Sequence, residues 1–207
     1  EEHASCGVGL VVSIDGSPSR KVVQAGIDAL KAVWHRGAVD ADGKTGDGAG
    51  IHVQIPVPFF YDQIERTGHT PRMDELMAVG QVFLPRTDFG AQETCRTIVE
   101  TEVLRMGYYI YGWRHVPVNV SCLGEKANAT RPEIEQLLVS NSKGVDEETF
   151  ERELYVIRRR IEKAAQSAGI HGLYLASLSC RSIIYKGMFL AEDMSEFYPD
   201  LKDERFE

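Results

Sequence analysis

Hydrophobic and polar residues alternate along the chain in patterns that predict both strands and helices. β-Branched residues at positions 6–14, followed by the turn pair Asp15-Gly16, predict a first strand. Ser19 is a suitable N-cap for a helix whose apolar residues follow at spacings of four, three and four, at Val23, Ile27, Leu30 and Trp34. We expect this amphipathic helix over residues 19–35, with Gly37 in the C-cap position.

The later part of the chain continues this mixture of elements. The predicted elements are, in order, strands at 51–55 and 77–84, a helix at 87–106, one or two strands at 108–120, a helix carrying Phe150, Leu154, Ile157 and Ile161, and strands at 173–178 and 181–185. The last two strands are close enough in sequence to predict a hairpin, and the acidic, aromatic tail 191–207 predicts no strand. Together these elements predict an α+β fold with antiparallel sheets flanked by helices.

The composition is that of an ordinary globular protein. The 207 residues are 43% hydrophobic and 26% charged, which suits one sizeable domain or two small ones and excludes a disordered chain. No apolar run approaches the length of about 18 residues that a membrane-spanning helix needs. Acidic residues outnumber basic ones by 31 to 23, a net charge of −8, so no nucleic-acid partner is expected. A small molecule or another protein is the expected partner.

The cysteines Cys6, Cys95, Cys122 and Cys180 are too far apart in sequence to form a Cys-x-x-Cys pair. We therefore expect no metal ion, and no iron–sulfur cluster held by this chain alone. A chain of this length without a secretory leader also does not need a disulfide framework. A reducing, intracellular setting is expected, with the cytoplasm as the predicted location and a plastid as the open alternative.

Cys6 is the strongest candidate for covalent chemistry, because it starts a predicted strand and only five residues precede it. A thiol becomes a nucleophile when another group takes its proton. One of six histidines could do so: His3, His35, His52, His69, His115 or His171. The α-amine of Cys6, with a pKa of about 7.7–8.0, could do so as well if residues 1–5 were removed. A third reading, an ordinary strand residue near a chain terminus, stays open.

Several blocks of sequence, taken together, resemble one family. They are Cys6-Gly-Val-Gly-Leu, Asp15-Gly16, His35-Arg-Gly-Ala38, Ala41-Asp-Gly-Lys-Thr-Gly-Asp-Gly-Ala-Gly50, the strand pair Leu178–Gly187 and the acidic segment Phe197–Phe206. In combination they are similar to the N-terminal glutaminase domain of glutamate synthase large subunits, which are class II glutamine amidotransferases. The resemblance runs from Cys6 to the end of the chain.

The resemblance implies an N-terminal-nucleophile hydrolase fold, in which two antiparallel sheets lie between helical layers in a four-layer αββα arrangement. Residues 1–5 would be a leader that is removed, residues 6–207 the front portion of the domain, and residues 57–165 an elaboration that contacts the synthase region. The implied activity is hydrolysis of L-glutamine to glutamate and ammonia through a cysteinyl thioester. The ammonia would pass through a tunnel to a synthase site that acts on 2-oxoglutarate.

The resemblance also implies cofactors, partners and site residues. No cofactor is expected in this chain, whereas FMN and an iron–sulfur cluster are implied for the rest of the synthase polypeptide, and an electron-donating subunit or ferredoxin as a partner. Cys6 would be the nucleophile and, through its freed amine, the base. Arg36 and Gly37 match the family's Arg-Gly pair beside the nucleophile, where glycine allows a close backbone approach. Asp47, like Lys44 and Thr45, is expected to order the glycine-rich loop.

The sequence departs from the family pattern in two places. In the family, the oxyanion hole is formed by an Asn-Gly pair, and the substrate carboxylate is bound by an arginine in a His-Gln-Arg-Tyr-Ser-Thr segment. Neither the pair nor the segment occurs in this sequence. We expect both beyond Glu207, so the chain alone is predicted to be inactive. Two other readings remain: a non-catalytic regulatory or assembly module of the same fold in a split synthase, and an unrelated thiol hydrolase using His171 or His35.

Overall fold

The chain forms two compact units. The computed structural model describes residues 7–34 and 37–207. The first unit consists of Glu1–Pro56, Pro117–Arg131 and Ile184–Glu207, and the second of Val57–Val116 and Pro132–Ile183. The chain therefore leaves the first unit and returns to it twice, and the first unit is built from three separate stretches of sequence.

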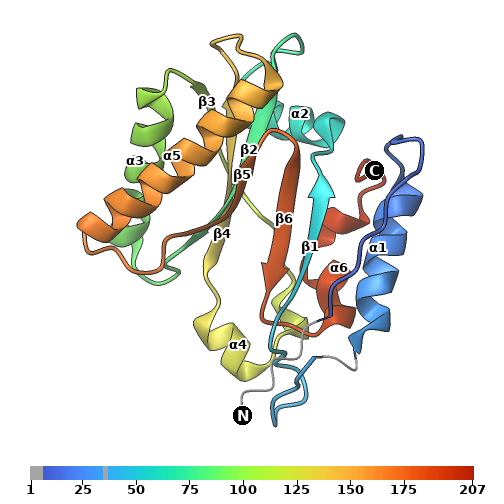
Figure 1. The fold of residues 1–207 in the computed structure, drawn as a ribbon. Helices are drawn as coiled ribbons and strands as arrows, with labels where there is room; N and C mark the ends of the chain where they lie inside the picture. The colour runs from blue at the N-terminus through green and yellow to red at the C-terminus, as the bar shows by residue number, and fades with distance from the viewer. Residues whose placement is uncertain (1–6, 35–36) are drawn as a thin grey trace. The chain divides into compact units, whose positions relative to one another are not determined.

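The described residues contain helices and strands in mixed order (Figure 1). The α-helices are α1 (Arg20–Ala32), α2 (Val57–Arg66), α3 (Phe89–Arg105), α4 (Glu125–Thr130), α5 (Glu147–Ser167) and α6 (Met194–Phe197). The strands are β1 (Ala49–Gln54), β2 (Met77–Leu84), β3 (Tyr109–His115), β4 (Glu133–Ser140), β5 (Tyr174–Ser179) and β6 (Ser182–Gly187). Short 3-10 helices lie at η2 (Val120–Cys122), η3 (Ala191–Asp193) and η4 (Pro199–Lys202).

The second unit is a sheet with two helices packed on it. Its four strands lie in the order β3-β4-β2-β5, and each neighbouring pair is antiparallel. Leu137 at the centre of β4 lies opposite Gly80 on one side and Trp113 on the other. α3 and α5 pack against this sheet and share one core cluster with it, in which Phe150, Leu154, Ile157 and Ile161 are fully buried. Burying each such side chain contributes about 1.5–3 kcal/mol.

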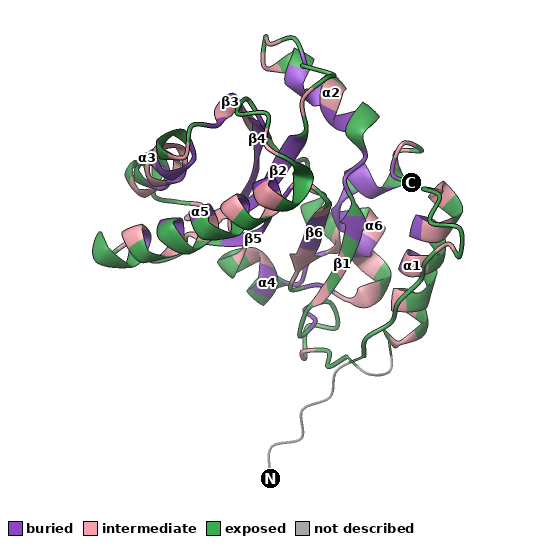
Figure 2. Ribbon diagram, turned by 45° about the horizontal axis from the view of Figure 1, so that its top comes forward, coloured by how far each residue is buried: buried purple, intermediate pink, exposed green. Residues whose placement is uncertain are grey.

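The periodic patterns predicted this unit well. The strand at 77–84 is β2, the helix at 87–106 contains α3, and the apolar stripe of α5 faces the core as expected. In Figure 2, β2 and β4 are coloured as buried, while exposed residues run along the outer side of α5. The α+β class with antiparallel sheets is therefore confirmed.

The first unit holds the short sheet of β1 and β6, whose arrows run in opposite directions in Figure 1. Ser19 caps α1 as predicted, because its side chain accepts a hydrogen bond from the amide of Lys21. The tail after β6 contains no strand in its described residues. Its aromatic side chains pack in a cluster with Tyr185 of β6; they are Phe189, Phe197, Tyr198 and Phe206. Arg20 of α1 donates a hydrogen bond of 2.8 Å to the carbonyl of Leu201, which ties the helix to this tail.

Two predictions for the start of the chain are wrong in the described residues. No strand is assigned to residues 7–14, where Val8, Leu10 and Ile14 are exposed by 96%, 86% and 105%. Strand preference reflects the fit of a side chain to a half-buried sheet surface, and in the described structure residues 7–14 join neither sheet. α1 ends at Ala32, because the amide of Val33 bonds the carbonyl of Leu30 and closes the last turn, so Gly37 is not its C-cap.

The predicted hairpin of residues 173–178 and 181–185 is also wrong. β5 pairs with β2 in the four-stranded sheet, whereas β6 pairs with β1, so consecutive strands lie in different sheets. The side chain of Ser179 accepts hydrogen bonds from the amides of Arg181 (3.0 Å) and Ser182 (3.2 Å), which forms a tight turn between them. Sequence analysis also missed α2, α4 and β4. α4 has only six residues and so carries little periodicity, whereas α2 has buried residues on one helix face and could have been predicted.

No helix in the described part of the chain has the length and apolar character required to cross a membrane.

Candidate active site

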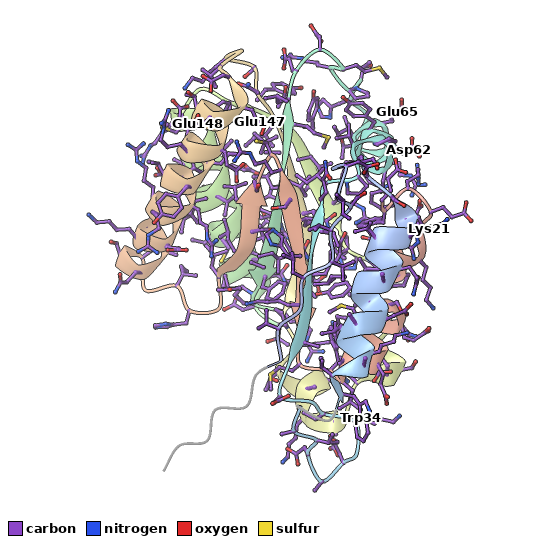
Figure 3. The ribbon with its side chains drawn as sticks, turned by 45° about the vertical axis from the view of Figure 1, so that its right-hand side comes forward. Lys21, Trp34, Asp62, Glu65, Glu147 and Glu148 are labelled. Atoms are coloured by element: carbon purple, nitrogen blue, oxygen red, sulfur yellow. The ribbon has the colours of Figure 1, made fainter. Side chains whose placement is uncertain are left out.

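A cavity of about 530 Å³ in the first unit gathers the sequence-predicted site residues that the structure describes. The end of α1, the glycine-rich loop and the stretch around η3 form its walls. Its lining includes Gly7, Trp34, Gly37, Asp47, Phe189 and Glu192. Trp34, labelled beyond the end of α1 in Figure 3, is 67% exposed and faces this cavity instead of a core.

Local hydrogen bonds give the glycine-rich loop its shape. Asp40 and Thr45 are joined by a backbone hydrogen bond of 2.9 Å, and Val39 and Gly46 form an antiparallel bridge. The carboxylate of Asp42 accepts hydrogen bonds from the Thr45 hydroxyl (2.6 Å) and from the amide of Thr45 (2.7 Å). These bonds lower the pKa of Asp42 to about 2. The loop is thus a small hairpin built around a charged carboxylate.

Glycines let residues 46–48 of this loop lie flat against the segment after β6. A Cβ atom at Gly46 would lie 2.6 Å from the carbonyl oxygen of Phe189, closer than any side chain permits. Gly48 has a φ of 121°, a conformation that L side chains rarely adopt. Asp47, between these two glycines, is held by a hydrogen bond of 3.2 Å from its amide to the carbonyl of Ala38. The glycines therefore place Asp47 at the cavity wall.

The four predicted site residues divide into two groups. Cys6 and Arg36 lie outside the described residues. Gly37 and Asp47 are described, and both line the cavity, with Asp47 Oδ1 lying 3.4 Å from the position of a Cβ on Gly37. Gly7, the neighbour of Cys6, lines the same cavity. The structure therefore brings together the described pair and the chain neighbour of the predicted nucleophile.

The sequence did not predict that the segment after β6 forms part of the cavity wall. Phe189, Leu190, Ala191 and Glu192 line the cavity although no motif marks them. A signal for the contact was present in the paired glycines, since Gly46 and Gly187 both pack closely on Phe189. Among the described lining residues, the ionisable side chains are those of Asp47 and Glu192, both acidic. A ligand carrying an ammonium group would be attracted to these walls.

The asparagines of the chain do not form an oxyanion hole in the described structure. Asn119 accepts a hydrogen bond from Ser121, Asn128 from Arg131, and Asn141 donates to Val145. All three are used in local caps and turns, and none lines the cavity.

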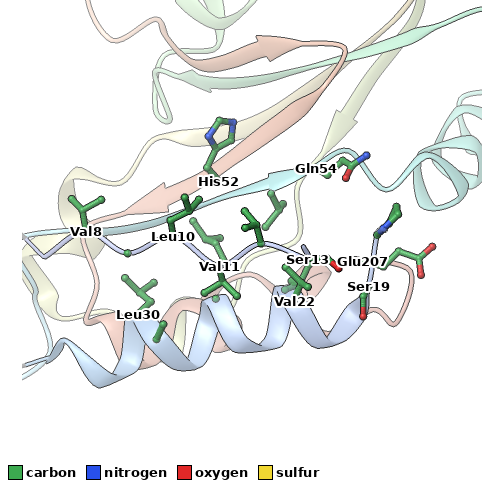
Figure 4. A pocket seen from close by; sticks show the side chains of 18 of the residues that line it. Val8, Leu10, Val11, Ser13, Ser19, Val22, Leu30, His52, Gln54 and Glu207 are labelled. Carbon is green, nitrogen blue, oxygen red and sulfur yellow. The ribbon is translucent and has the colours of Figure 1, made fainter. Parts of the chain in front are cut away.

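A larger cavity of about 780 Å³ lies beside the first one, between residues 7–13, α1 and β1 (Figure 4). Val8, Leu10, Val11, Val22 and Leu30 give it mostly apolar walls, and His52 and Glu207 are its ionisable lining residues. Gly7 lines both cavities. The larger cavity is lined by residues of the first family block, Gly7 to Leu10, but by neither Gly37 nor Asp47, so it is the weaker candidate for a site of chemistry.

Metal ligands are not clustered in the part of the chain that the structure describes. Across those residues, no group of three or more His, Cys, Asp or Glu side chains could hold a metal ion. Cys95, Cys122 and Cys180 are free thiols, and burial raises the pKa of each. None of these three thiols has the lowered pKa of a reactive cysteine.

Comparison with known proteins identifies the family of the chain. Residues 6–207 match the family described as Glutamine amidotransferases class-II. The chain therefore belongs to the class II glutamine amidotransferases.

Its relatives point to one kind of large enzyme. Over 207 residues it is 66% identical to a glutamate synthase (NADPH) large chain of Azospirillum brasilense, covering 100% of this chain and 14% of the relative. It is 39% identical over 206 residues to a chloroplastic ferredoxin-dependent glutamate synthase of Oryza sativa subsp. japonica, covering 99% and 13%. For a glutamate synthase (NADPH) large chain of Bacillus subtilis the identity is 37% over 210 residues, covering 99% and 13%. The chain thus spans about a seventh of the length of the relatives it matches.

Proposed function

We propose that this chain is the glutaminase part of a glutamate synthase. It hydrolyses L-glutamine to glutamate and ammonia, and the ammonia passes to a synthase site that acts on 2-oxoglutarate. The observation that carries the proposal is the cavity lined by Gly7, Gly37 and Asp47, because these residues adjoin or include the family motif around Cys6 and Arg36. The acidic lining suits the α-ammonium group of glutamine.

The proposed chemistry uses the thiol and the α-amine of Cys6. After removal of residues 1–5, the free amine of Cys6 takes the thiol proton, and the thiolate attacks the side-chain amide carbon of glutamine. The carbon–nitrogen bond breaks, the amine returns the proton to the leaving nitrogen, and ammonia departs. Water then attacks the thioester, which releases glutamate and restores the thiol. The sum is glutamine plus water giving glutamate plus ammonia.

The finer architecture belongs to the same proposal. We propose a four-layer αββα fold with residues 1–5 as a removed leader, residues 6–207 as the front portion of the domain and residues 57–165 as its elaboration. Support comes from two antiparallel sheets with helices packed against them, and from a second compact unit that begins at Val57. The oxyanion donors and the arginine for the substrate carboxylate would come from outside these 207 residues, consistent with asparagines that are all engaged elsewhere.

The proposed cofactors and partners follow from the relatives. Those relatives are named as NADPH or ferredoxin-dependent glutamate synthases, so the whole protein would take electrons from a subunit or from ferredoxin. FMN and an iron–sulfur cluster would be carried by other parts of the polypeptide.

Two measurements on the native full-length protein test the proposal. Mass spectrometry of the N-terminal peptide should show a chain that begins at Cys6. Cys6→Ala should abolish glutamate formation from glutamine, while formation from added ammonia continues, because the synthase site needs ammonia and not the thiol. Glutamine hydrolysis that survives Cys6→Ala would overturn the proposal. A wild-type protein that uses ammonia but never glutamine would favour the non-catalytic assembly module.

A further inference from the structure

A stretch of sequence without any active-site motif contacts the glycine-rich loop. The chain leaves β3, contributes Pro117–Arg131 to the first unit, and returns to form β4. Within this stretch, Gly124 is the N-cap of the short helix α4. A Cβ atom at Gly124 would lie 2.2 Å from both Asp42 Oδ2 and Thr45 Oγ1. The backbone of Gly124 therefore lies directly against the hydrogen-bonded centre of the loop.

A second contact joins the same two segments. The ammonium group of Lys126 lies 2.7 Å and 2.9 Å from the two carboxylate oxygens of Asp40. The hydrogen bond from Lys126 is the largest cause that lowers the pKa of Asp40. Gly124 and Lys126 thus contact the loop at two points, which together hold the limb from Asp40 to Thr45.

Residues 40–45 are connected to the cavity wall by the chain itself and by hydrogen bonds across the loop. Thr45 is 5% exposed and immediately precedes Gly46 and Asp47, which line the cavity. Asp40 is bonded to Thr45 across the loop, and Val39 is bridged to Gly46. Gly46 packs closely on the segment after β6, since a Cβ added there would lie 2.6 Å from the Phe189 carbonyl oxygen. A shift of Thr45 is therefore expected to reach Gly46 and Asp47 at the cavity wall, because they follow it directly in the chain.

We propose that Gly124 and Lys126 are positioning residues for the glutamine pocket, acting through Thr45 and Asp40 on the placement of Asp47. The inference rests on the proposed glutaminase function and deepens it, because it assigns a role to a stretch that carries no catalytic motif. Neither residue touches the substrate. The Lys126–Asp40 pair has side-chain exposures of 70% and 32%, so it contributes little to stability, and its loss acts on the loop.

The test compares variants of the native full-length protein. Lys126→Ala should raise the KM for glutamine roughly tenfold, since small displacements of a binding wall have large effects on substrate placement. The kcat at saturating glutamine, the activity with added ammonia and the melting temperature should stay near the wild-type values. Lys126→Arg should restore the KM, because arginine keeps the charge that pairs with Asp40.

A matched control is available in the same unit. Lys202 forms an exposed ion pair of 2.7 Å with Glu196, with side-chain exposures of 52% and 54%, and it lines neither cavity. Lys202→Ala should leave the KM for glutamine unchanged. Equal KM values for the Lys126→Ala and Lys202→Ala variants would overturn the inference while leaving the glutaminase function intact. Failure of the function itself would instead appear as a wild-type protein without glutamine hydrolysis.

Gly124→Ala is the stronger variant, because its methyl group must displace Thr45 or Asp42. The expected result is a roughly hundredfold loss of kcat/KM for glutamine with ammonia-dependent activity retained. Unchanged glutamine kinetics in this variant would also overturn the inference. If Gly124→Ala does not fold, the Lys126 and Lys202 variants decide the question.

Discussion

Gly37 and Asp47 face each other at the cavity wall, with Asp47 Oδ1 lying 3.4 Å from the place where a Cβ of Gly37 would stand. They are ten residues apart in sequence, and the loop hairpin between them brings them together. The carbonyl oxygen of Trp34 lies 3.5 Å from the same Cβ position. A side chain at position 37 would thus enter the space between the end of α1 and the loop.

Gly37→Ala should lower kcat/KM for glutamine roughly tenfold in the full-length protein, because the added methyl group occupies space at the cavity wall beside Asp47. A Cβ at position 37 would meet Asp47 Oδ1 at 3.4 Å and the Trp34 carbonyl oxygen at 3.5 Å, which are ordinary contact distances, so the stability should change by less than about 1 kcal/mol. Gly26→Ala in α1 is the control, since its Cβ would meet only Ile51 Cδ1 at 3.6 Å. Glutamine kinetics that are the same in both variants would show that the cavity does not bind the substrate.

Asp42 should titrate well below an ordinary aspartate. The Thr45 hydroxyl, followed by the amides of Thr45 and Lys44, holds its pKa at about 2, against 3.8 for the free side chain. Its contribution to stability is therefore complete above pH 3.8 and is lost as the pH falls toward 2. Carboxyl NMR titration of the 207-residue chain should show this midpoint, and Thr45→Val should move it upward. A midpoint that Thr45→Val leaves unchanged would contradict the hydrogen-bonded loop.

Arg96 of α3 and Glu135 of β4 form a largely buried ion pair in the second unit. Two guanidinium nitrogens lie 2.9 Å and 2.6 Å from the Glu135 oxygens, and the side chains are only 20% and 11% exposed. Arg96→Ala leaves a nearly buried carboxylate unpaired, so it should lower the free energy of unfolding by about 2–4 kcal/mol. Urea denaturation measures this loss.

The control for that measurement is Arg181→Ala. Arg181 pairs with Glu147 at 2.7 Å, but both side chains are more than half exposed. Figure 3 shows Glu147 and Glu148 at the start of α5, where acidic side chains interact favourably with the positive end of the helix dipole. Loss of the Arg181–Glu147 pair should lower the free energy of unfolding by less than about 1 kcal/mol. Equal destabilisation by the two variants would show that burial does not set the strength of the Arg96 pair.

The Cys180 thiol should react slowly with alkylating reagents. Burial and the neighbouring Glu151 raise its pKa to about 12, and Glu151 Oε2 lies 3.1 Å from the sulfur. Iodoacetamide at pH 8 should therefore label Cys180 far more slowly than a free cysteine peptide, because the thiolate is the reactive form. Glu151→Gln removes the negative charge and should accelerate labelling, as measured by peptide mass spectrometry. Rapid labelling of the wild-type thiol would contradict its burial.

The sequence alone determined the elements that are long and periodic. α5 was predicted because its apolar residues recur with the period of one helix face, and β2 because its residues form one apolar run. The Ser19 cap and the family motif around Gly37 and Asp47 were also readable, since each depends on residues that are close in sequence.

Only the tertiary structure decided which distant segments meet. β5 and β6 lie next to each other in sequence but pair in different sheets, and residues 7–14 have strand composition without a strand. The contact of Gly124 with Asp42, and that of Gly46 with Phe189, join residues that no local pattern relates. The physical reason is that periodicity reports which side of an element is buried, whereas the neighbour that buries it depends on the packing of the whole chain.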